Sequence, residues 1–359
     1  MQKKSQAVVR AIDVGYGHVK WTDGRDDANQ IISDTFPSQA PVIFEGEWTS
    51  TVFHKHDTFL VPVNGQVFGV GREIRSCLER SQELEQLDEH FAMSDGYMAR
   101  VYGAFNYMLP NLPSRTIDYL MLGLPMTTLE HYEAKLSERF LGEHIINQKG
   151  DRVLVKHCAV YPQPLGGYAT YLQRPLPRHT EAPIALIVDA GYNTVDWIAC
   201  EGLKPNRSQS GAVECGMSGY LRKVAKSIVK SKGLSSGQES SIVRLLDQAM
   251  ISGGKFLLTG KPFDIEPHLK AGQPVLEQAA QAVRNNVGAG LGIDLIIVSG
   301  GGAKFYAPFV SEKFPNHVLV SLPSSSMANV NGFQQFGEWI ANSAERATPN
   351  HIEGEAVHA

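Results

Sequence analysis

The fold is decided by the stretch Leu186-Ile187-Val188-Asp189-Ala190-Gly191-Tyr192-Asn193-Thr194-Val195-Asp196-Trp197. The N-terminal region carries a second version, Ala11-Ile12-Asp13-Val14-Gly15-Tyr16-Gly17-His18-Val19-Lys20-Trp21. Each stretch is an apolar run, then Asp-x-Gly-Tyr, then a second run ending in Trp, and this pattern predicts a β-hairpin. The two aspartates are 176 residues apart, about the length of one domain. The sequence therefore indicates two similar halves.

A hairpin of this kind suits a polyphosphate and its metal ion. Glycine in the turn accepts a positive φ and lets backbone N–H groups approach phosphate oxygens, while the aspartate faces the metal or its water. We therefore expect Asp13 and Asp189 to lie near Mg²⁺ and to bind it through water. Lys20, on the return strand, could neutralise a phosphate, or it is a solvated strand lysine. Asp196 is expected to be structural, because it lies on the opposite strand of the hairpin from Asp189.

Three other segments suit a nucleotide. Gly300-Gly301-Gly302 follows a predicted buried strand at 295–298, so a ring or phosphate could lie against bare backbone; a tight corner is the alternative. Gln163 stands at a strand–helix junction, where it could orient a water without titrating or simply begin the helix. The glycine-rich run 211–219 could border a ribose. The lysine-rich helix after it could approach a phosphate or be a solvated face.

Strands and helices alternate along the chain, which predicts α/β layers. Further strands are expected within 31–75 and at 117–125 and 152–160, and helices at 94–108, 128–140, 162–172, 217–232, 236–250, 273–288 and 328–344. We place the first domain at 1–175, with a strand-rich insertion at about 31–95, and the second at 180–327. The boundary is a linker rich in Pro, Arg and His at 174–183. Helix 328–344 returns to the first domain, and 345–359 is a polar tail.

Composition excludes several classes of protein. The 359 residues are 43% hydrophobic and 19% charged, as in an ordinary globular protein of two domains. A net charge of −4 argues against direct nucleic-acid binding. The four cysteines lack CxxC spacing and suit a reducing compartment. The N-terminus leaves no room for a signal peptide and no apolar stretch has the length of a membrane span, so we expect a cytoplasmic protein without membrane contact.

Three familiar site motifs are missing from the sequence. Gly260-Lys261 is followed by Pro262 and lacks the first glycine of a P-loop. Gly15-x-Gly17 lacks the third glycine and the helix of a dinucleotide fingerprint. The Gly-x-Ser-x-Gly string of Ser/His/Asp hydrolases does not occur.

Five segments together resemble the actin, Hsp70 and sugar-kinase superfamily. In family order they are Asp13-x-Gly15-x-Gly17 with Lys20 as first phosphate loop, Gln163 as first connecting segment, Asp189-x-Gly191 as second phosphate loop, Val298-Ser299-Gly300-Gly301-Gly302-Ala303 as adenosine motif, and Met327-Ala328-Asn329-Val330-Asn331-Gly332 as second connecting segment. The ordered set, over about residues 8–340, is far more specific than any single member. The resemblance implies two ribonuclease H-like α/β domains flanking a nucleotide cleft.

Within this superfamily the chain most resembles plasmid-segregation actins of the ParM/StbA type. The supporting strings are Gly15-Tyr16-Gly17, Phe68-Gly69-Val70-Gly71, Leu122-Gly123-Leu124-Pro125 and Gln163-Pro164. The resemblance implies a cytoplasmic ATPase that polymerises into filaments of itself and segregates plasmid DNA through a DNA-binding adaptor protein on a plasmid centromere. His18 departs from the small polar residue of many related loops. Two alternatives stay open, a small-molecule kinase of the same superfamily and a scaffold that binds nucleotide without hydrolysing it.

The resemblance also implies a set of site residues. ATP, with GTP as an alternative, is the expected ligand together with Mg²⁺, which Asp13 and Asp189 would hold through water. The expected catalytic residues are Gln163, Asp189 and Asp13. The expected nucleotide contacts are Asp13, Gly15, Tyr16, Gly17, His18, Lys20, Gly191, Tyr192, Asn193, Glu214, Gly216, Lys223, Gly300, Gly301, Gly302 and Lys304.

Overall fold

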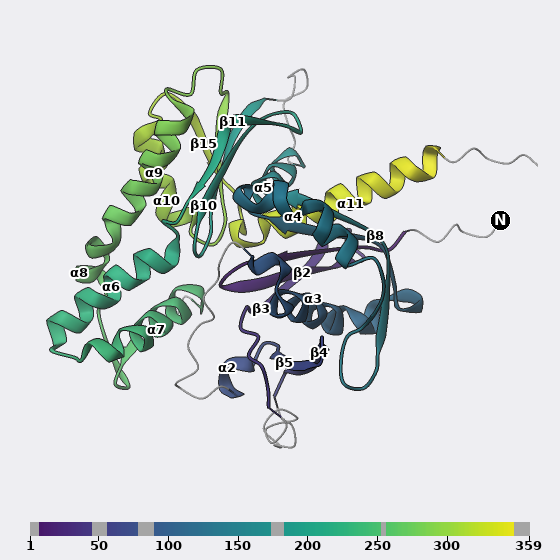
Figure 1. Ribbon diagram of the computed structural model, residues 1–359. Coiled ribbons are helices and arrows are strands. Elements are labelled where there is room, and N and C mark those ends of the chain that lie inside the picture. Colours follow the sequence, from purple (N-terminus) through teal and green to yellow (C-terminus); the bar gives the residue numbers. More distant parts are fainter. Residues whose placement is uncertain (1–6, 45–55, 78–89, 174–182, 253–255, 348–359) are drawn as a thin grey trace, which may run out of the picture.

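The computed structural model describes residues 7–44, 56–77, 90–173, 183–252 and 256–347, which form two α/β domains (Figure 1). The first domain is built on a sheet with the strands, in spatial order, β3 (Ile31–Pro37), β2 (His18–Arg25), β1 (Val9–Val14), β6 (Thr116–Leu124), β8 (Arg152–Pro162) and β7 (Gly142–Ile145). The second is built on a sheet with the strands β11 (Lys204–Val213), β10 (Val195–Glu201), β9 (Ile184–Ala190), β14 (Leu295–Ser299) and β15 (Val318–Ser321).

The two sheets share one topology. In each, three antiparallel strands lead into two parallel ones, so that β1, β2, β3, β6 and β8 correspond to β9, β10, β11, β14 and β15. Among the described strands of the two sheets, β7 alone has no counterpart. The prediction of two similar α/β domains is confirmed, and each Asp-x-Gly hairpin begins its own sheet.

Helices cover both faces of each sheet, which explains why strand β1 is buried along its whole length. The outer face of the first sheet packs against α3 (Asp95–Met108), and that of the second against α6 (Met217–Lys232), α9 (Gln273–Val287) and α10 (Ala303–Lys313). Ser94 caps α3 as its sequence predicts, since the Ser94 side chain accepts a hydrogen bond from the Tyr97 N–H.

Two helices lie between the domains (Figure 1). Helix α5 (Gln163–Leu172) follows β8 of the first sheet but packs against β9, β10 and β14 of the second. Helix α11 (Ala328–Ala347) follows the second domain but packs against β1 and β6 of the first. Each helix thus leaves one domain and covers the sheet of the other, and the two form a shared apolar core.

The two connecting helices touch through bare backbone. A Cβ atom added at Gly332 would lie 1.9 Å from the backbone oxygen of Gly166, and one added at Gly166 would lie 2.3 Å from that of Asn329. Such distances leave no room for a side chain at either position. The glycines therefore set the close approach of α5 and α11, the two helices that lie between the domains.

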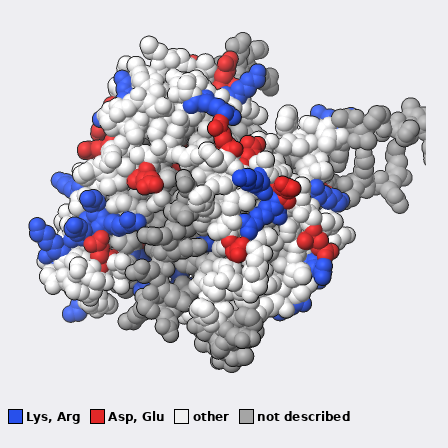
Figure 2. Space-filling model, viewed as in Figure 1, with Lys and Arg blue, Asp and Glu red and all other residues white. Residues whose placement is uncertain are grey.

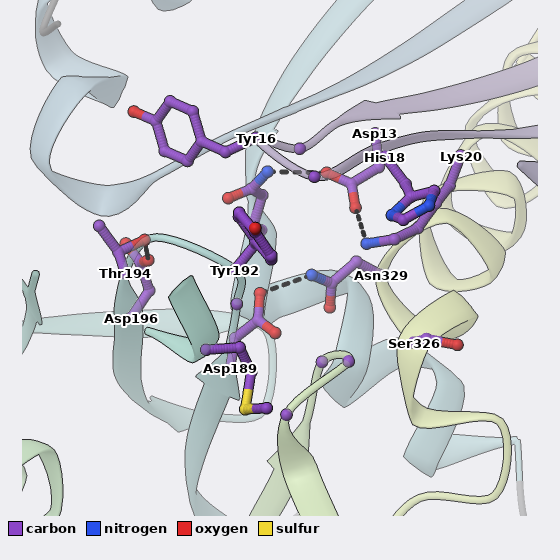
Figure 3. A pocket seen from close by; sticks show the side chains of 18 of the residues that line it. Asp13, Tyr16, His18, Lys20, Asp189, Tyr192, Thr194, Asp196, Ser326 and Asn329 are labelled. Carbon is purple, nitrogen blue, oxygen red and sulfur yellow. Dashed lines mark hydrogen bonds and ion pairs between the residues drawn. The ribbon is translucent and has the colours of Figure 1, made fainter. Parts of the chain in front are cut away.

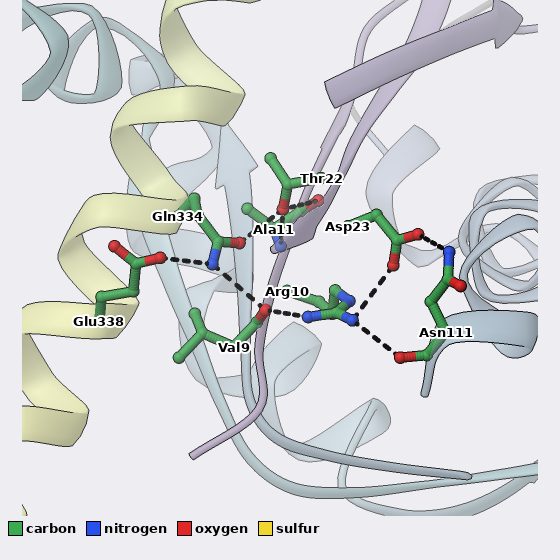
Figure 4. A network of polar contacts seen from close by, with 8 residues as sticks. All are labelled: Val9, Arg10, Ala11, Thr22, Asp23, Asn111, Gln334 and Glu338. Atoms are coloured by element: carbon green, nitrogen blue, oxygen red, sulfur yellow. Dashed lines mark hydrogen bonds and ion pairs between the residues drawn. The ribbon is translucent and has the colours of Figure 1, made fainter. Parts of the chain in front are cut away.

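A polar network fixes α11 to the first sheet (Figure 4). Gln334 accepts a hydrogen bond from the Thr22 hydroxyl at 2.6 Å and donates to the Val9 carbonyl at 3.3 Å. Beside it, Arg10 pairs with Asp23 at 3.1 Å, and both side chains are buried. Buried polar groups are costly unless they are paired, so this network specifies where α11 lies on the sheet.

Smaller elements complete the two domains. The insertion of the first domain holds β4 (Phe59–Val63), β5 (Gln66–Val70) and α2 (Ile74–Cys77), and the second domain adds α7 (Glu239–Ser252), α8 (Glu266–Leu269), β12 (Leu257–Leu258) and β13 (Lys261–Pro262). Helix α4 (Met126–Arg139) lies between β6 and β8 in the chain. Asn64-Gly65, a dipeptide typical of two-residue hairpin turns, forms the turn between β4 and β5.

The structure adds elements that the sequence pattern did not predict, namely β7, β11, β15 and α10. Strand β11 reads as polar because it lies at an edge of its sheet and is half exposed, and α10 contains Pro308. The expected linker at 174–183 and the tail from 345 fall almost entirely outside the described residues, so the domain boundaries remain a prediction. Helix α11 extends to Ala347, past the expected end at 344.

Candidate functional site

A cavity of about 460 Å³ lies between the two hairpins, and both domains contribute to its wall (Figure 3). The hairpin turns have matching geometry: the Gly15 N–H donates to the His18 carbonyl at 3.1 Å, and the Gly191 N–H donates to the Thr194 carbonyl at 2.9 Å. The turns also meet, since a Cβ at Gly17 would lie 3.1 Å from the Tyr192 ring. The sheets therefore direct the ends of β1 and β9 into one cavity.

Asp13 is the most enclosed polar group on the first-domain side, with 1% of its surface exposed. In the β1–β2 pair it lies directly opposite Lys20, so both side chains leave the same face of the sheet. Lys20 Nζ is 2.9 Å from Asp13 Oδ2, and Gln163 Nε2 donates to Asp13 Oδ1 at 2.7 Å. Both carboxylate oxygens are thus held by groups that favour their negative charge.

The two basic residues of the first hairpin that line the cavity, Lys20 and His18, are in different charge states. Burial alone would lower the pKa of Lys20, but the carboxylates of Asp13 and Asp189 raise it, so the lysine is charged. Burial, with Arg75 and Lys20 nearby, lowers the pKa of His18 to about 4, so its imidazole is neutral at pH 7. Lys20 is therefore a cation available to a phosphate, whereas His18 can offer only a neutral ring.

Asp189 has the corresponding place in the second domain and is 6% exposed. Its Oδ2 accepts a hydrogen bond from Asn329 Nδ2 at 2.7 Å. Its Oδ1 faces the turn after β14, where a Cβ at Gly300 would be only 2.3 Å away. Burial raises the pKa of Asp189 to about 6, against the opposing effects of Lys20 and the Asn329 hydrogen bond.

Asp196, which its position on the strand opposite Asp189 predicts to be structural, also lines the cavity. The register pairs Asp196 directly with Asp189, and directly opposed residues of antiparallel strands share a face. Asp196 accepts hydrogen bonds from the Thr194 hydroxyl at 2.6 Å and the Met126 N–H at 3.3 Å. Burial is the main cause that raises the pKa of Asp196 to about 7.

The glycine turn after β14 forms the floor of the cavity. Gly300 has φ +87°, a conformation that suits glycine, and its close approach to Asp189 excludes any side chain. A Cβ at Gly302 would lie 2.9 Å from the Met217 side chain, whereas one at Gly301 would meet nothing within 4 Å. The turn therefore presents open backbone at Gly301, as a flat ring or a phosphate requires.

Most of the expected site residues line this one cavity: Asp13, Gly15, Tyr16, Gly17, His18, Lys20, Gln163, Asp189, Gly191, Tyr192, Gly300, Gly301, Gly302 and Lys304. Figure 3 shows Asp13, Asp189 and Lys20 converging from different strands. Residues from segments far apart in the chain meet because both hairpins end at the cavity between the domains.

Four expected contacts do not line the cavity: Asn193, Glu214, Gly216 and Lys223. The Gly216 N–H donates to the Asn193 carbonyl at 2.9 Å, so these two residues form the support behind the Tyr192 turn. Glu214 and Lys223 are exposed. Lys223 belongs to the outer helices of the second domain, over which Lys and Arg side chains gather in Figure 2.

The sequence interpretation also missed several residues that line the cavity: Tyr97, Thr194, Asp196, Asp247, Met250, Ser324, Ser325, Ser326 and Asn329. For Asn329 a signal exists in the sequence, because it lies in the string Met327-Ala328-Asn329-Val330-Asn331-Gly332, which resembles the second connecting segment of the superfamily. For Asp196 the signal was its spacing of seven residues from Asp189, the same as that between Asp13 and Lys20.

Two family models match the chain, one in each half. "Actin like proteins N terminal domain" matches residues 11–166, and "Archaeal actin homologue MreB-like, C-terminal" matches residues 187–312. The chain belongs to the actin-like superfamily. No curated protein sequence matches this chain.

Solved structures of actin-like proteins share the fold over nearly the whole chain. A non-polymerisable quadruple mutant of pCBH ParM has a TM-score of 0.68 at 18% identity, covering 92% of this chain and 99% of its own. The archaeal actin homologue Ta0583 in complex with ADP has 0.67 at 18%, covering 95% and 100%. A ParM filament from Clostridium botulinum has 0.66 at 17%, covering 93% and 100%. The expected likeness to ParM-type actins is confirmed at the level of the fold.

Two kinds of feature are absent from the described residues. None of their helices is both long and apolar enough to cross a membrane. They also contain no group of three or more His, Cys, Asp or Glu side chains that could hold a metal ion. A metal at this site would need oxygen ligands from water or from a bound ligand besides the two aspartates.

Proposed function

We propose that this protein binds ATP with Mg²⁺ in the cleft and hydrolyses it as part of a cycle of assembly into filaments, with GTP as an alternative ligand. The observation that carries the proposal is the meeting of Asp13, Lys20, Gln163 and Asp189 from three separate segments in one cavity. A volume of about 460 Å³ is within the range of nucleotide-sized pockets.

The residues present fit a hydrated magnesium ion. Asp13 and Asp189 are both buried and face the same cavity, and Mg²⁺ typically keeps several waters and takes one or two carboxylates plus phosphate oxygens. When bound, the ion would neutralise charge on the phosphates. Lys20 would balance further phosphate charge, because its ammonium is already held in the cavity beside Asp13.

Gln163 and Asp196 are the side chains best placed to orient an attacking water. Gln163 donates to Asp13 through Nε2, which leaves its Oε1 as an acceptor in the cavity wall. Asp196 adds a buried carboxylate, held by Thr194, from the opposite domain. An amide cannot act as a general base but can position water, which suits slow hydrolysis used as a timer.

Hydrolysis would change how strongly the bound nucleotide holds the two domains together. Its wall comes from both domains, and the domains are joined through the crossing of α5 and α11. A ligand that contacts both sides therefore favours one angle between the domains over another. We propose that this angle controls assembly of the chain with copies of itself, and that the filaments move plasmid DNA through a DNA-binding adaptor in the cytoplasm.

Phosphate release and sedimentation test the proposal together. The protein should release phosphate from Mg·ATP without any added acceptor and should pellet with ATP but not without it. Asp189→Ala should lose the phosphate release. Turnover that survives this substitution would refute the site assignment, and failure to pellet with any nucleotide would refute the filament.

One observation favours a second candidate function, a small-molecule kinase. Such an enzyme needs a carboxylate near the phosphates to activate an acceptor, and Asp196 is a buried carboxylate in the cavity wall. The same phosphate assay separates the two functions, because a kinase would need an acceptor for efficient turnover. A scaffold that holds nucleotide without hydrolysing it would release no phosphate at all.

A further inference from the structure

The shared topology of the two sheets gives each site residue a counterpart in the other domain. Strands β1 and β9 correspond, and the next-to-last residue of each is an aspartate that lines the cavity, Asp13 and Asp189. Strands β8 and β15 correspond as the last parallel strands, and they lead into α5 and α11. The first turn of α11 is therefore the counterpart of the first turn of α5, where Gln163 lies.

Asn329, the second residue of α11, makes the same contact in the second domain that Gln163 makes in the first. Gln163 Nε2 donates to Asp13 Oδ1 at 2.7 Å, and Asn329 Nδ2 donates to Asp189 Oδ2 at 2.7 Å. Figure 3 shows the Asn329 side chain directed at Asp189. In both domains a helix that crosses to the other domain thus begins with an amide held against the site aspartate.

The surroundings of Asn329 leave its amide little freedom. Asn329 is 3% exposed, and its backbone oxygen lies so close to α5 that a Cβ at Gly166 would approach it to 2.3 Å. Its Oδ1 has no hydrogen-bond partner among the described residues. An apolar residue of similar size would fill the same space, so the volume of the Asn329 side chain alone does not explain why an amide stands here. The hydrogen bond to Asp189 supplies that reason.

We propose that Asn329 is a positioning residue for Asp189: it holds the carboxylate in one orientation, in which it can serve a hydrated cation in the cavity. The inference rests on the proposed function, because it assigns a role within the same Mg²⁺-nucleotide site. Side chains that orient metal-bound carboxylates change metal affinity by about 10- to 100-fold when they are removed. Without the Asn329 donor, Asp189 can turn about its Cα–Cβ and Cβ–Cγ bonds, and its Oδ2 loses its only described partner.

The contact also links the site to the domain crossing. Asn329 lies three residues before Gly332, whose backbone packs against Gly166 of α5. Gln163 lies three residues before Gly166 in the same way. Each aspartate is thus tied by one hydrogen bond to the helix turn that forms the crossing, so a shift of either carboxylate is passed to the contact between the domains.

The test compares nucleotide affinity with and without Mg²⁺. Fluorescent ADP is titrated into the wild-type protein, Asn329→Asp and Asn329→Ser, once with Mg²⁺ and once with EDTA. Asn329→Asp keeps the shape but sets a carboxylate against Asp189. Asn329→Ser shortens the side chain so that it no longer reaches Asp189, and it is the variant to use if Asn329→Asp fails to fold. Asn342→Asp is the matched control, because it makes the same change at an exposed position of the same helix.

We expect the increase in affinity that Mg²⁺ gives to fall by about 10- to 100-fold in the Asn329 variants. Their affinity in EDTA should stay within about twofold of the wild type, and Asn342→Asp should behave as the wild type. Retention of the full Mg²⁺ effect in both Asn329 variants would overturn the inference. So would an equal loss with and without Mg²⁺, since that pattern marks a purely structural role. A wild-type protein that binds no ADP would instead refute the proposed function, and the inference with it.

Discussion

Replacing Gly332 by alanine places one methyl group at the crossing of α5 and α11. That Cβ would lie 1.9 Å from the Gly166 oxygen, whereas ordinary contact begins near 3.4 Å, so the helices must separate by about 1.5 Å. The obstructing atoms are backbone and cannot rotate away. Overpacking of this kind costs about 1–3 kcal/mol, and we take the upper end because both helices must move. Alanine recovers about 1 kcal/mol of helix propensity, which leaves a net loss of about 2 kcal/mol.

Thermal unfolding followed by circular dichroism measures this loss. A net 2 kcal/mol corresponds to a fall in Tm of roughly 4–8 °C for domains of this size. Gly219→Ala in α6 is the matched control, because a Cβ there would meet only the Val275 side chain at 3.4 Å. That variant should gain up to about 1 kcal/mol from the same substitution. A Gly332→Ala protein as stable as Gly219→Ala would refute the role assigned to the helix crossing.

Three further predictions concern single side chains. Burial raises the pKa of the Asp196 carboxyl to about 7. Its contribution to the stability of the fold is therefore present in full below about pH 4 and is lost as the pH rises to 7. Over this range Asp196→Asn should become more stable than the wild type, by up to about 4 kcal/mol. Urea unfolding at several pH values checks this, and parallel pH profiles would contradict it. Lys20→Met removes the cation beside Asp13. ATP affinity should fall by about 10- to 100-fold, as expected for the loss of a charged hydrogen bond of about 1.5–3 kcal/mol. An unchanged Kd in a fluorescence titration would place the phosphates elsewhere. Ser94→Ala removes the cap of α3 and should lower the free energy of unfolding in urea by about 1 kcal/mol, whereas Ser94→Asp, which can also cap, should not.

Local patterns predicted much of the fold because they depend on nearby residues. The twin Asp-x-Gly hairpins, the Ser94 cap and the Asn64-Gly65 turn each specify their own structure. Strand β11 and helix α10 were missed because tertiary packing decides them: β11 is held by pairing with β10, and α10 continues through Pro308.

In the site, too, local sequence patterns predict some residues and tertiary contacts decide the others. The positions of Asp13, Lys20 and Asp189 in one cavity could be predicted because the local hairpin pattern singles these residues out. The position of Asp196 in the same cavity could not, since the face on which a strand residue lies depends on the register with its partner strand. The contact of Asn329 with Asp189 could not be predicted, because it spans 140 residues and exists only once α11 has crossed to the other domain.

The central claim is that Asp13 and Asp189, from separate domains, serve one Mg²⁺-nucleotide site. Isothermal titration with Mg·ATP tests it most directly, using the wild type, Asp13→Asn, Asp189→Asn and the double variant. We predict one nucleotide per chain, a large loss of affinity in each single variant, and a double variant little weaker than either, because residues in one site are not additive. Two nucleotides per chain, or losses that add independently in the double variant, would contradict a shared site.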